Sequence, residues 1–151
     1  MRFRLFLTLL ALTATVSAQD PSAALRHVEV SADADANQGS ATAIDLVFFY
    51  DRAGVAVAPK TAPEWFAQKS ALLSRLGSTI DVVSLQLPPG TALSAVALPS
   101  RHRRAVTVQL YANYIATDGQ PVLNLSSFRH AIVRLKSATI EVVEHRKPDR
   151  R

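Results

Sequence analysis

The sequence contains no cysteine, so no disulfide bond can stabilise the protein. Many small exported domains depend on such bridges, and this chain must instead be stable through its hydrophobic core. The absence of cysteine also removes the usual route to a lipoprotein, because that route attaches lipid to a cysteine directly after the signal cleavage site. We therefore expect a protein without the common lipid anchor.

The signatures of enzymes and of metal centres are absent from the sequence as well. It has no Gly-x-Ser-x-Gly elbow, no phosphate-binding loop and no His-Glu-x-x-His motif. Its histidines are His27, His102, His130 and His145. None of them has the spacing of a metal ligand relative to another histidine or carboxylate on one face, and the first and last flank predicted strands, where solvent should surround them. We expect a non-catalytic protein with no metal or cofactor.

Long apolar runs are scarce, and the run at the N-terminus is too short to cross a membrane. Two arginines precede an uncharged apolar run over residues 5–16, and small residues follow at Ser17 and Ala18. A membrane-spanning helix needs about 20 apolar residues. Residues 1–18 are therefore predicted to be a cleavable secretory signal peptide, with Gln19 at the position where a lipoprotein would have its cysteine.

The excess of positive charge is modest, which argues against a nucleic-acid partner. The formal net charge is +5, and loss of the two arginines in the signal peptide lowers it to +3. Nucleic-acid binders usually carry a denser basic stripe with interleaved aromatic residues. One basic cluster, Arg101, Arg103 and Arg104, precedes a predicted strand. It is a candidate surface for anionic lipid headgroups or an acidic partner, and a solvated turn is the alternative.

The residues after the signal peptide suit a single domain, and their hydrophobic pattern alternates mainly with a period of two. The segment 44–50 is apolar on both faces, which predicts a central strand. The turn at 87–90 contains two prolines and a glycine, and Asp118-Gly119 predicts a second turn. The segments expected to be strands are 28–32, 44–50, 80–87, 93–98, 106–114, 122–125, 131–135 and 139–143.

Residues 63–76 have helical spacing instead. A proline in the first turn, Glu64 near the positive end of the helix dipole and Gly77 as the C-terminal stop all favour a helix here. Its apolar stripe, which includes Trp65 and Leu72, is expected to pack on the core. One inserted helix among seven or eight short strands predicts an all-β domain, a two-sheet β-sandwich.

This β-sandwich domain is expected to cover residues 25–145. A short polar lead, residues 19–24, precedes it, and a basic tail, residues 146–151, follows it.

The loop between the first two predicted strands is rich in polar residues. Asp33 and Asp35 alternate with alanine before Asn37 and Gly39. The pattern resembles a fragment of a calcium-binding loop, but the glycine at position six and the closing glutamate are missing. Asn and Asp favour turns because their side chains bond the local backbone, so a polar loop is the preferred interpretation. A loop of this chemistry is also a candidate recognition surface.

The order of these segments resembles the TssJ (SciN) family, the small outer-membrane lipoproteins of the bacterial type VI secretion system. The similarity extends over residues 28–143, and it depends on the combination of segments because no single motif is specific. The matching segments are the Asn- and Gly-containing loop 35–40, the apolar strand 44–50 ending on a Tyr, the aromatic-led helix 65–77 ending on Leu-Gly, the strand and Pro-Gly turn 83–90, the strand 106–114 and the closing β-pair 130–143.

This resemblance implies a transthyretin-like two-sheet sandwich with one added helix, located in the periplasm and associated with the outer membrane. It also implies binding to the periplasmic region of the inner-membrane protein TssM, within a trans-envelope complex that includes TssL. The loop implied to hold TssM maps onto residues 33–42, where the candidate contacts are Asp35, Asn37, Gln38 and Gly39.

The sequence departs from this family at the lipidated cysteine, which puts tethering to the outer membrane in doubt and leaves the fold and partner binding untouched. The alternative function is a generic periplasmic sandwich that binds a small ligand or peptide, for instance along a sheet edge.

Overall fold

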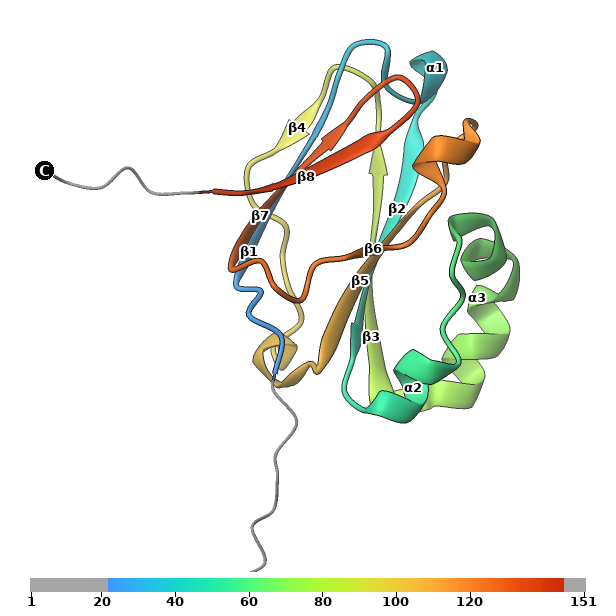
Figure 1. The fold of residues 1–151 in the computed structure, drawn as a ribbon, viewed down its shortest axis with the longest axis vertical. Coiled ribbons are helices and arrows are strands. Elements are labelled where there is room, and N and C mark those ends of the chain that lie inside the picture. The colour runs from blue at the N-terminus through green and yellow to red at the C-terminus, as the bar shows by residue number, and fades with distance from the viewer. Residues whose placement is uncertain (1–21, 146–151) are drawn as a thin grey trace, which may run out of the picture.

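The computed structural model describes residues 22–145, which form two four-stranded sheets packed face to face, with helices against the outer face of one sheet (Figure 1). The first sheet has the order β4-β1-β7-β8 and the second has the order β3-β2-β5-β6. The predicted all-β sandwich is thereby confirmed. The predicted signal peptide, the first part of the polar lead and the basic tail lie outside the described residues.

The elements of the first sheet are β1 (His27–Ala32), β4 (Ala92–Leu93), β7 (His130–Leu135) and β8 (Ile140–Glu144). Those of the second are β2 (Thr42–Phe49), β3 (Ile80–Leu87), β5 (Thr107–Ala112) and β6 (Leu123–Asn124). The helices are α1 (Ala36–Gly39), α2 (Arg52–Ala56) and α3 (Ala62–Leu76), and the single-turn 3₁₀ helices are η1 (Gly77–Thr79), η2 (His102–Arg104) and η3 (Thr117–Gly119). No helix among residues 22–145 is both long and apolar enough to cross a bilayer.

Strand β2 occupies the centre of its sheet, as its two apolar faces predicted. It pairs in antiparallel fashion with β3 on one side and β5 on the other. Leu46 and Phe48 belong to the core between the two sheets, whereas Val47 and Phe49 belong to a second cluster under the helices. Because neighbouring side chains of a strand point to opposite faces, one apolar segment supplies both cores.

Strand β1 is parallel to β7, whereas the other strand pairs are antiparallel. Its alternate residues Val28, Val30 and Ala32 are buried against the second sheet, so His27 and Glu29 lie on the outer face. The register places His27 opposite His130, the first residue of β7. The outer face of this sheet therefore carries polar side chains that are fixed in position by a regular backbone ladder.

Helix α3 covers the outer face of the second sheet through its single tryptophan. Trp65 is fully buried, and its ring stacks on Tyr111 with 4.8 Å between ring centroids. The indole Nε1 donates a hydrogen bond to Asp45 Oδ2 at 2.7 Å, and Lys69 Nζ lies 2.8 Å from the same oxygen. Ser84 donates to the other carboxylate oxygen at 2.6 Å. The buried carboxylate is thus fully partnered, which is the condition for burying a charge without a large penalty.

The boundaries of α3 agree with those predicted from the sequence, but one predicted strand is largely absent. Thr61 is the N-cap residue of α3, and Gly77 ends it with a φ of 50°. The prediction of a strand over 93–98 is wrong beyond Leu93, because β4 pairs with β1 at only two positions. After these, the described chain leaves the edge of the first sheet and keeps one backbone bond to it, from Val96 N to the Val28 carbonyl at 2.9 Å.

Candidate interaction site

Three loops, the first of which contains α1, meet at the end of the sandwich where β1 ends (Figure 1). They are residues 33–41, 113–120 and 136–139, and we call them together the loop end. Backbone bonds join the first loop to the third: Asn37 N donates to the Lys136 carbonyl at 3.0 Å, and Gln38 N donates to the Ser137 carbonyl at 3.2 Å. The side chain of Asn37 joins the first loop to the second. Loops that are far apart in the sequence thereby become one surface.

The loop 33–41 has an uncommon backbone. Asn37 (φ 49°) and Gln38 (φ 56°) are both left-handed, and Gly39 follows with a φ of 78°. The left-handed helical conformation costs roughly 1–2 kcal/mol per ordinary residue, and only glycine and, less often, asparagine or aspartate adopt it routinely. Backbone strain of this kind persists only where the surroundings impose it, and it concentrates at functional sites.

The side chain of Asn37 supplies that constraint. It is only 2% exposed. Its Nδ2 donates to the carbonyl of Asn113 at 3.2 Å, and its Oδ1 accepts from the backbone N–H of Ile115 at 2.8 Å. The family resemblance implied that Asn37 contacts the partner directly, whereas its amide is turned inward in the structure. Asn37 holds two loops together and so shapes the surface that other residues present.

The exposed residues of the loop end differ in chemistry. Asp35, Gln38 and Gly39 are all exposed. Beside them lies Ile115, which is 56% exposed and has the largest exposed fraction among the large hydrophobic residues at the surface of the described chain. Protein interfaces commonly combine an apolar centre with polar groups around it. Nothing in the sequence singled out Ile115, because it follows a predicted strand and resembles a core residue.

The buried residue Tyr114 packs beneath the loop end and supports it. The hydroxyl of Tyr114 donates to the Lys136 carbonyl at 2.8 Å. Burial, reinforced by the negative charge of Asp33, raises the pKa of Tyr114 to about 12, so the phenol stays neutral and keeps its proton for this bond. Gly119 lies against the ring, where a Cβ would come within 2.8 Å of the tyrosine Cβ. Only glycine fits at this close approach.

The three arginines of the predicted basic surface have different surroundings in the structure. Arg101 is engaged internally: its Nε lies 2.9 Å from Asp81 Oδ2, and its guanidinium carbon is 4.0 Å from the centroid of the Tyr50 ring. Hydrogen bonds from Arg101 lower the pKa of Asp81, while burial, with the adjacent Asp81 carboxylate, raises the pKa of Tyr50. Arg103 and Arg104 on η2 are exposed. Within this cluster, the exposed charges are therefore those of Arg103 and Arg104.

Three histidines gather at the outer face of the first sheet, an arrangement that the sequence pattern did not indicate. His27 and His130 lie on adjacent strands, and their ring centroids are 4.2 Å apart. His145 stacks on His130 with 4.5 Å between centroids. Glu29, which lies 101 residues before His130 in the sequence, accepts a hydrogen bond from its ring at 2.7 Å. Spacing along the chain cannot reveal such a group, because the parallel pairing of β1 and β7 creates it.

Buried apolar side chains form the core between the sheets, among them Phe48, Leu110 and Leu135.

No family model matches the sequence, and no curated protein matches it. Solved structures do match. A crystal structure of the type VI secretion lipoprotein TssJ1 from Pseudomonas aeruginosa has a TM-score of 0.59 and 18% identity, with 81% of this chain and 96% of that chain covered. Lip from Serratia marcescens, a membrane-bound component of the type VI secretion system, has a TM-score of 0.51 and 17% identity, with 79% and 96% covered.

A third structure, of a type VI membrane complex, has a TM-score of 0.53 and 14% identity, with 78% of this chain and 95% of that chain covered. At these identities the comparison shows a common fold. The fold that the sequence resemblance implied is therefore confirmed.

Proposed function

We propose that this protein, which has the fold of the TssJ lipoproteins, is a structural, non-catalytic component of a type VI secretion membrane complex in the cell envelope. The observation that carries the proposal is the extent of the likeness. It covers 81% of this chain and 96% of the Pseudomonas aeruginosa lipoprotein, so the whole described sandwich corresponds, not an isolated motif. Fold alone does not determine function, so the proposal also names a site, the loop end.

The loop end is proposed to bind the periplasmic domain of a TssM-like inner-membrane protein. Gln38 and Asp35 offer polar groups, Gly39 offers an open backbone and Ile115 offers an apolar anchor. Asn37 holds the loop in its left-handed conformation before any partner arrives. A surface that is already ordered loses less conformational entropy on association, which favours tight binding.

The protein is proposed to act in the periplasm, delivered there by the predicted signal peptide. Arg103 and Arg104, both exposed on η2, are proposed as a contact to an anionic membrane surface or to an acidic partner. Attraction between exposed charges is screened by salt. A high-salt wash of the membrane fraction should therefore release the protein if these arginines hold it, whereas retention through the wash would contradict this attachment.

Binding is tested with the purified protein and the purified periplasmic domain of the TssM-like protein from the same genome, by isothermal titration calorimetry. Ile115→Glu places a charge at the centre of the proposed interface and should weaken binding about thirtyfold or more, the effect of losing a residue worth about 2 kcal/mol. Gln38→Ala should weaken it by a smaller factor, because one exposed polar contact is worth about 1 kcal/mol.

Leu73→Glu is the matched control. Leu73 is 38% exposed on α3, so it undergoes the same change of a surface hydrophobic residue to glutamate away from the loop end. Its affinity should equal that of the unmodified protein. Equal affinities for Ile115→Glu and Leu73→Glu would place the interface elsewhere, and absence of any complex with the unmodified protein would contradict the proposed partner.

A further inference from the structure

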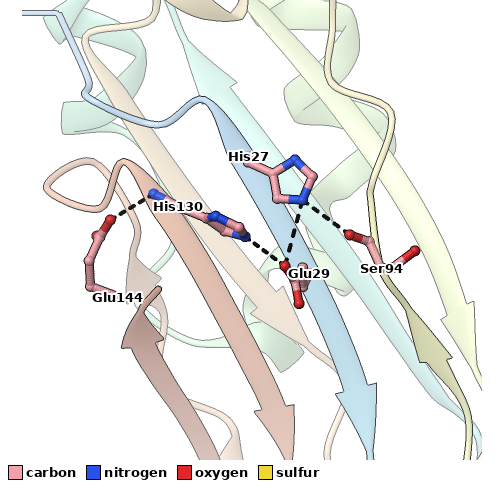
Figure 2. A network of polar contacts seen from close by, with 5 residues as sticks. All are labelled: His27, Glu29, Ser94, His130 and Glu144. Atoms are coloured by element: carbon pink, nitrogen blue, oxygen red, sulfur yellow. Dashed lines mark hydrogen bonds and ion pairs between the residues drawn. The ribbon is translucent and has the colours of Figure 1, made fainter. Parts of the chain in front are cut away.

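The histidine group lies away from the loop end, on the outer face of the first sheet where β1 and β7 begin (Figure 2). His27 and Glu29 come from β1, and His130 comes from β7. Figure 2 shows the Glu29 carboxylate directed to the space between the two imidazole rings. Its Oε1 lies 2.7 Å from His130 Nε2 and 3.8 Å from His27 Nε2.

We infer that His27, Glu29 and His130 form a binding site for a divalent cation of the zinc class. One donor atom from each residue lies within 4.8 Å of the other two. A tetrahedral zinc ion with nitrogen and oxygen ligands at about 2.0–2.1 Å separates those ligand atoms by roughly 3.4 Å. The two separations from the Glu29 oxygen, 2.7 and 3.8 Å, fall on either side of this value, so side-chain rotations would bring the three atoms onto one ion.

The backbone holds the three donors in place. His27 and His130 are opposite each other in the parallel ladder, and Glu29 is two residues further along the same face of β1. The carboxylate of Glu144 accepts hydrogen bonds from the backbone N–H groups of Arg129 and His130, at 3.0 and 2.9 Å, which fixes the start of β7. The ligands therefore project from a regular sheet and not from a loop, which limits the ordering needed on binding.

The surroundings orient the imidazole rings. His145 stacks on His130 with an interplanar angle of 20°, and its backbone N–H donates to the His130 carbonyl at 2.9 Å. His27 Nε2 bonds the carbonyl of Ser94 at 3.1 Å, so this nitrogen carries the proton, because a carbonyl can only accept. When a cation binds at Nε2, the neutral ring moves its proton to Nδ1, and the Nε2 lone pair becomes the ligand.

The ligand set selects the kind of cation. Two imidazole nitrogens and one carboxylate oxygen form a common zinc-binding set with a fourth position open to water. Magnesium and calcium prefer sites made of oxygen atoms alone. The side chains of His27, Glu29 and His130 are 39%, 33% and 26% exposed, so an ion reaches them from solvent.

The charges around the cluster are compatible with a bound cation. A surface hollow of about 420 Å³ lies beside it, lined by residues that include Arg26, Arg129 and Glu144. The guanidinium of Arg26 is held on the carbonyls of Ala23 and Leu25, at 3.0 and 2.7 Å. The carboxylate of Glu29, which is itself a ligand, and that of Glu144 offset the positive charge of the two arginines.

A cation at this site would link β1 to β7, the only parallel strand pair among residues 22–145. A ligand that binds the folded state and not the unfolded state raises stability with its concentration. The site is therefore expected to make the thermal stability of the sandwich depend on zinc.

The test uses the protein purified without a histidine tag and titrated with zinc chloride, by calorimetry and by thermal denaturation. We expect one zinc ion per chain and a melting temperature that rises with zinc concentration, and no effect of magnesium chloride. His27→Ala and His130→Ala should each lower zinc affinity at least tenfold, since loss of even an outer-shell partner typically costs about 10–100-fold. Glu29→Gln, which keeps the size of the side chain, should also lower the affinity.

His102→Ala is the matched control, because His102 bonds the Pro99 carbonyl on η2 and is not part of the cluster. Its zinc affinity should equal that of the unmodified protein. Circular dichroism establishes that each variant is folded before titration. The absence of saturable zinc binding would overturn the inference, and so would equal affinities for folded His130→Ala and His102→Ala.

Discussion

Replacing Asn37 with alanine tests how the loop end is held. The substitution removes two hydrogen bonds, to the Asn113 carbonyl and from the Ile115 N–H. Each is worth about 1 kcal/mol net. Alanine at a φ of 49° adds about 1 kcal/mol of backbone strain relative to asparagine. The free energy of unfolding should therefore fall by about 3 kcal/mol, with the melting temperature lower by about 12 °C for a domain of this size.

Urea denaturation followed by circular dichroism measures this change, and two glycine variants separate its causes. Asn37→Gly removes the hydrogen bonds but relieves the strain, so it should cost about 2 kcal/mol. Gln38→Gly changes an exposed residue with a similar φ of 56° and should stay within about 1 kcal/mol of the unmodified protein. An Asn37→Ala variant within about 0.5 kcal/mol of the unmodified protein would show that these two hydrogen bonds do not hold the loop. Equal costs for alanine and glycine would refute the strain contribution.

Other packing contacts lead to further expected outcomes. Asp45→Ala removes the acceptor beneath α3 and should lower the free energy of unfolding by about 3 kcal/mol; an unchanged urea midpoint would contradict this role. Gly119→Ala should destabilise by about 2 kcal/mol because its methyl group meets the Tyr114 ring, and an unaltered melting temperature would show that this loop moves aside easily. Arg101 lowers the pKa of Asp81, so their pairing stabilises the fold above the ordinary value of 3.8, and this stabilisation is lost as the pH falls through the lowered pKa. In Arg101→Met the carboxyl of Asp81 should titrate nearer 3.8 by NMR, and an unchanged titration curve would contradict the assignment.

Much of the fold could be predicted from local patterns. The alternation in residues 44–50 places apolar side chains on both faces, and β2 lies at the centre of its sheet for that reason. The helical spacing around Trp65 and the stop at Gly77 located α3 to within a residue of its observed start. These features depend on residues within a few positions of one another, and hydrophobic periodicity reports such neighbours directly.

The features that depend on tertiary contacts could not be predicted in this way. The left-handed turn at Asn37 and Gln38 requires the carbonyl of Asn113 and the N–H of Ile115, which lie more than seventy residues away. The sequence could indicate a polar loop there but not the inward direction of the asparagine amide. The histidine cluster likewise depends on parallel pairing of β1 with β7, and periodicity within one strand says nothing about its neighbour.

The loop end of this TssJ-like sandwich is proposed to bind a TssM-like periplasmic domain. Hydrogen–deuterium exchange on the purified complex locates the bound surface most directly. We predict that binding slows exchange at backbone amides in residues 33–41 and 113–120 and leaves those of α3 unchanged. Protection confined to α3 or to the edge strand β3, with the loop end exchanging as in the free protein, would contradict the proposed interface.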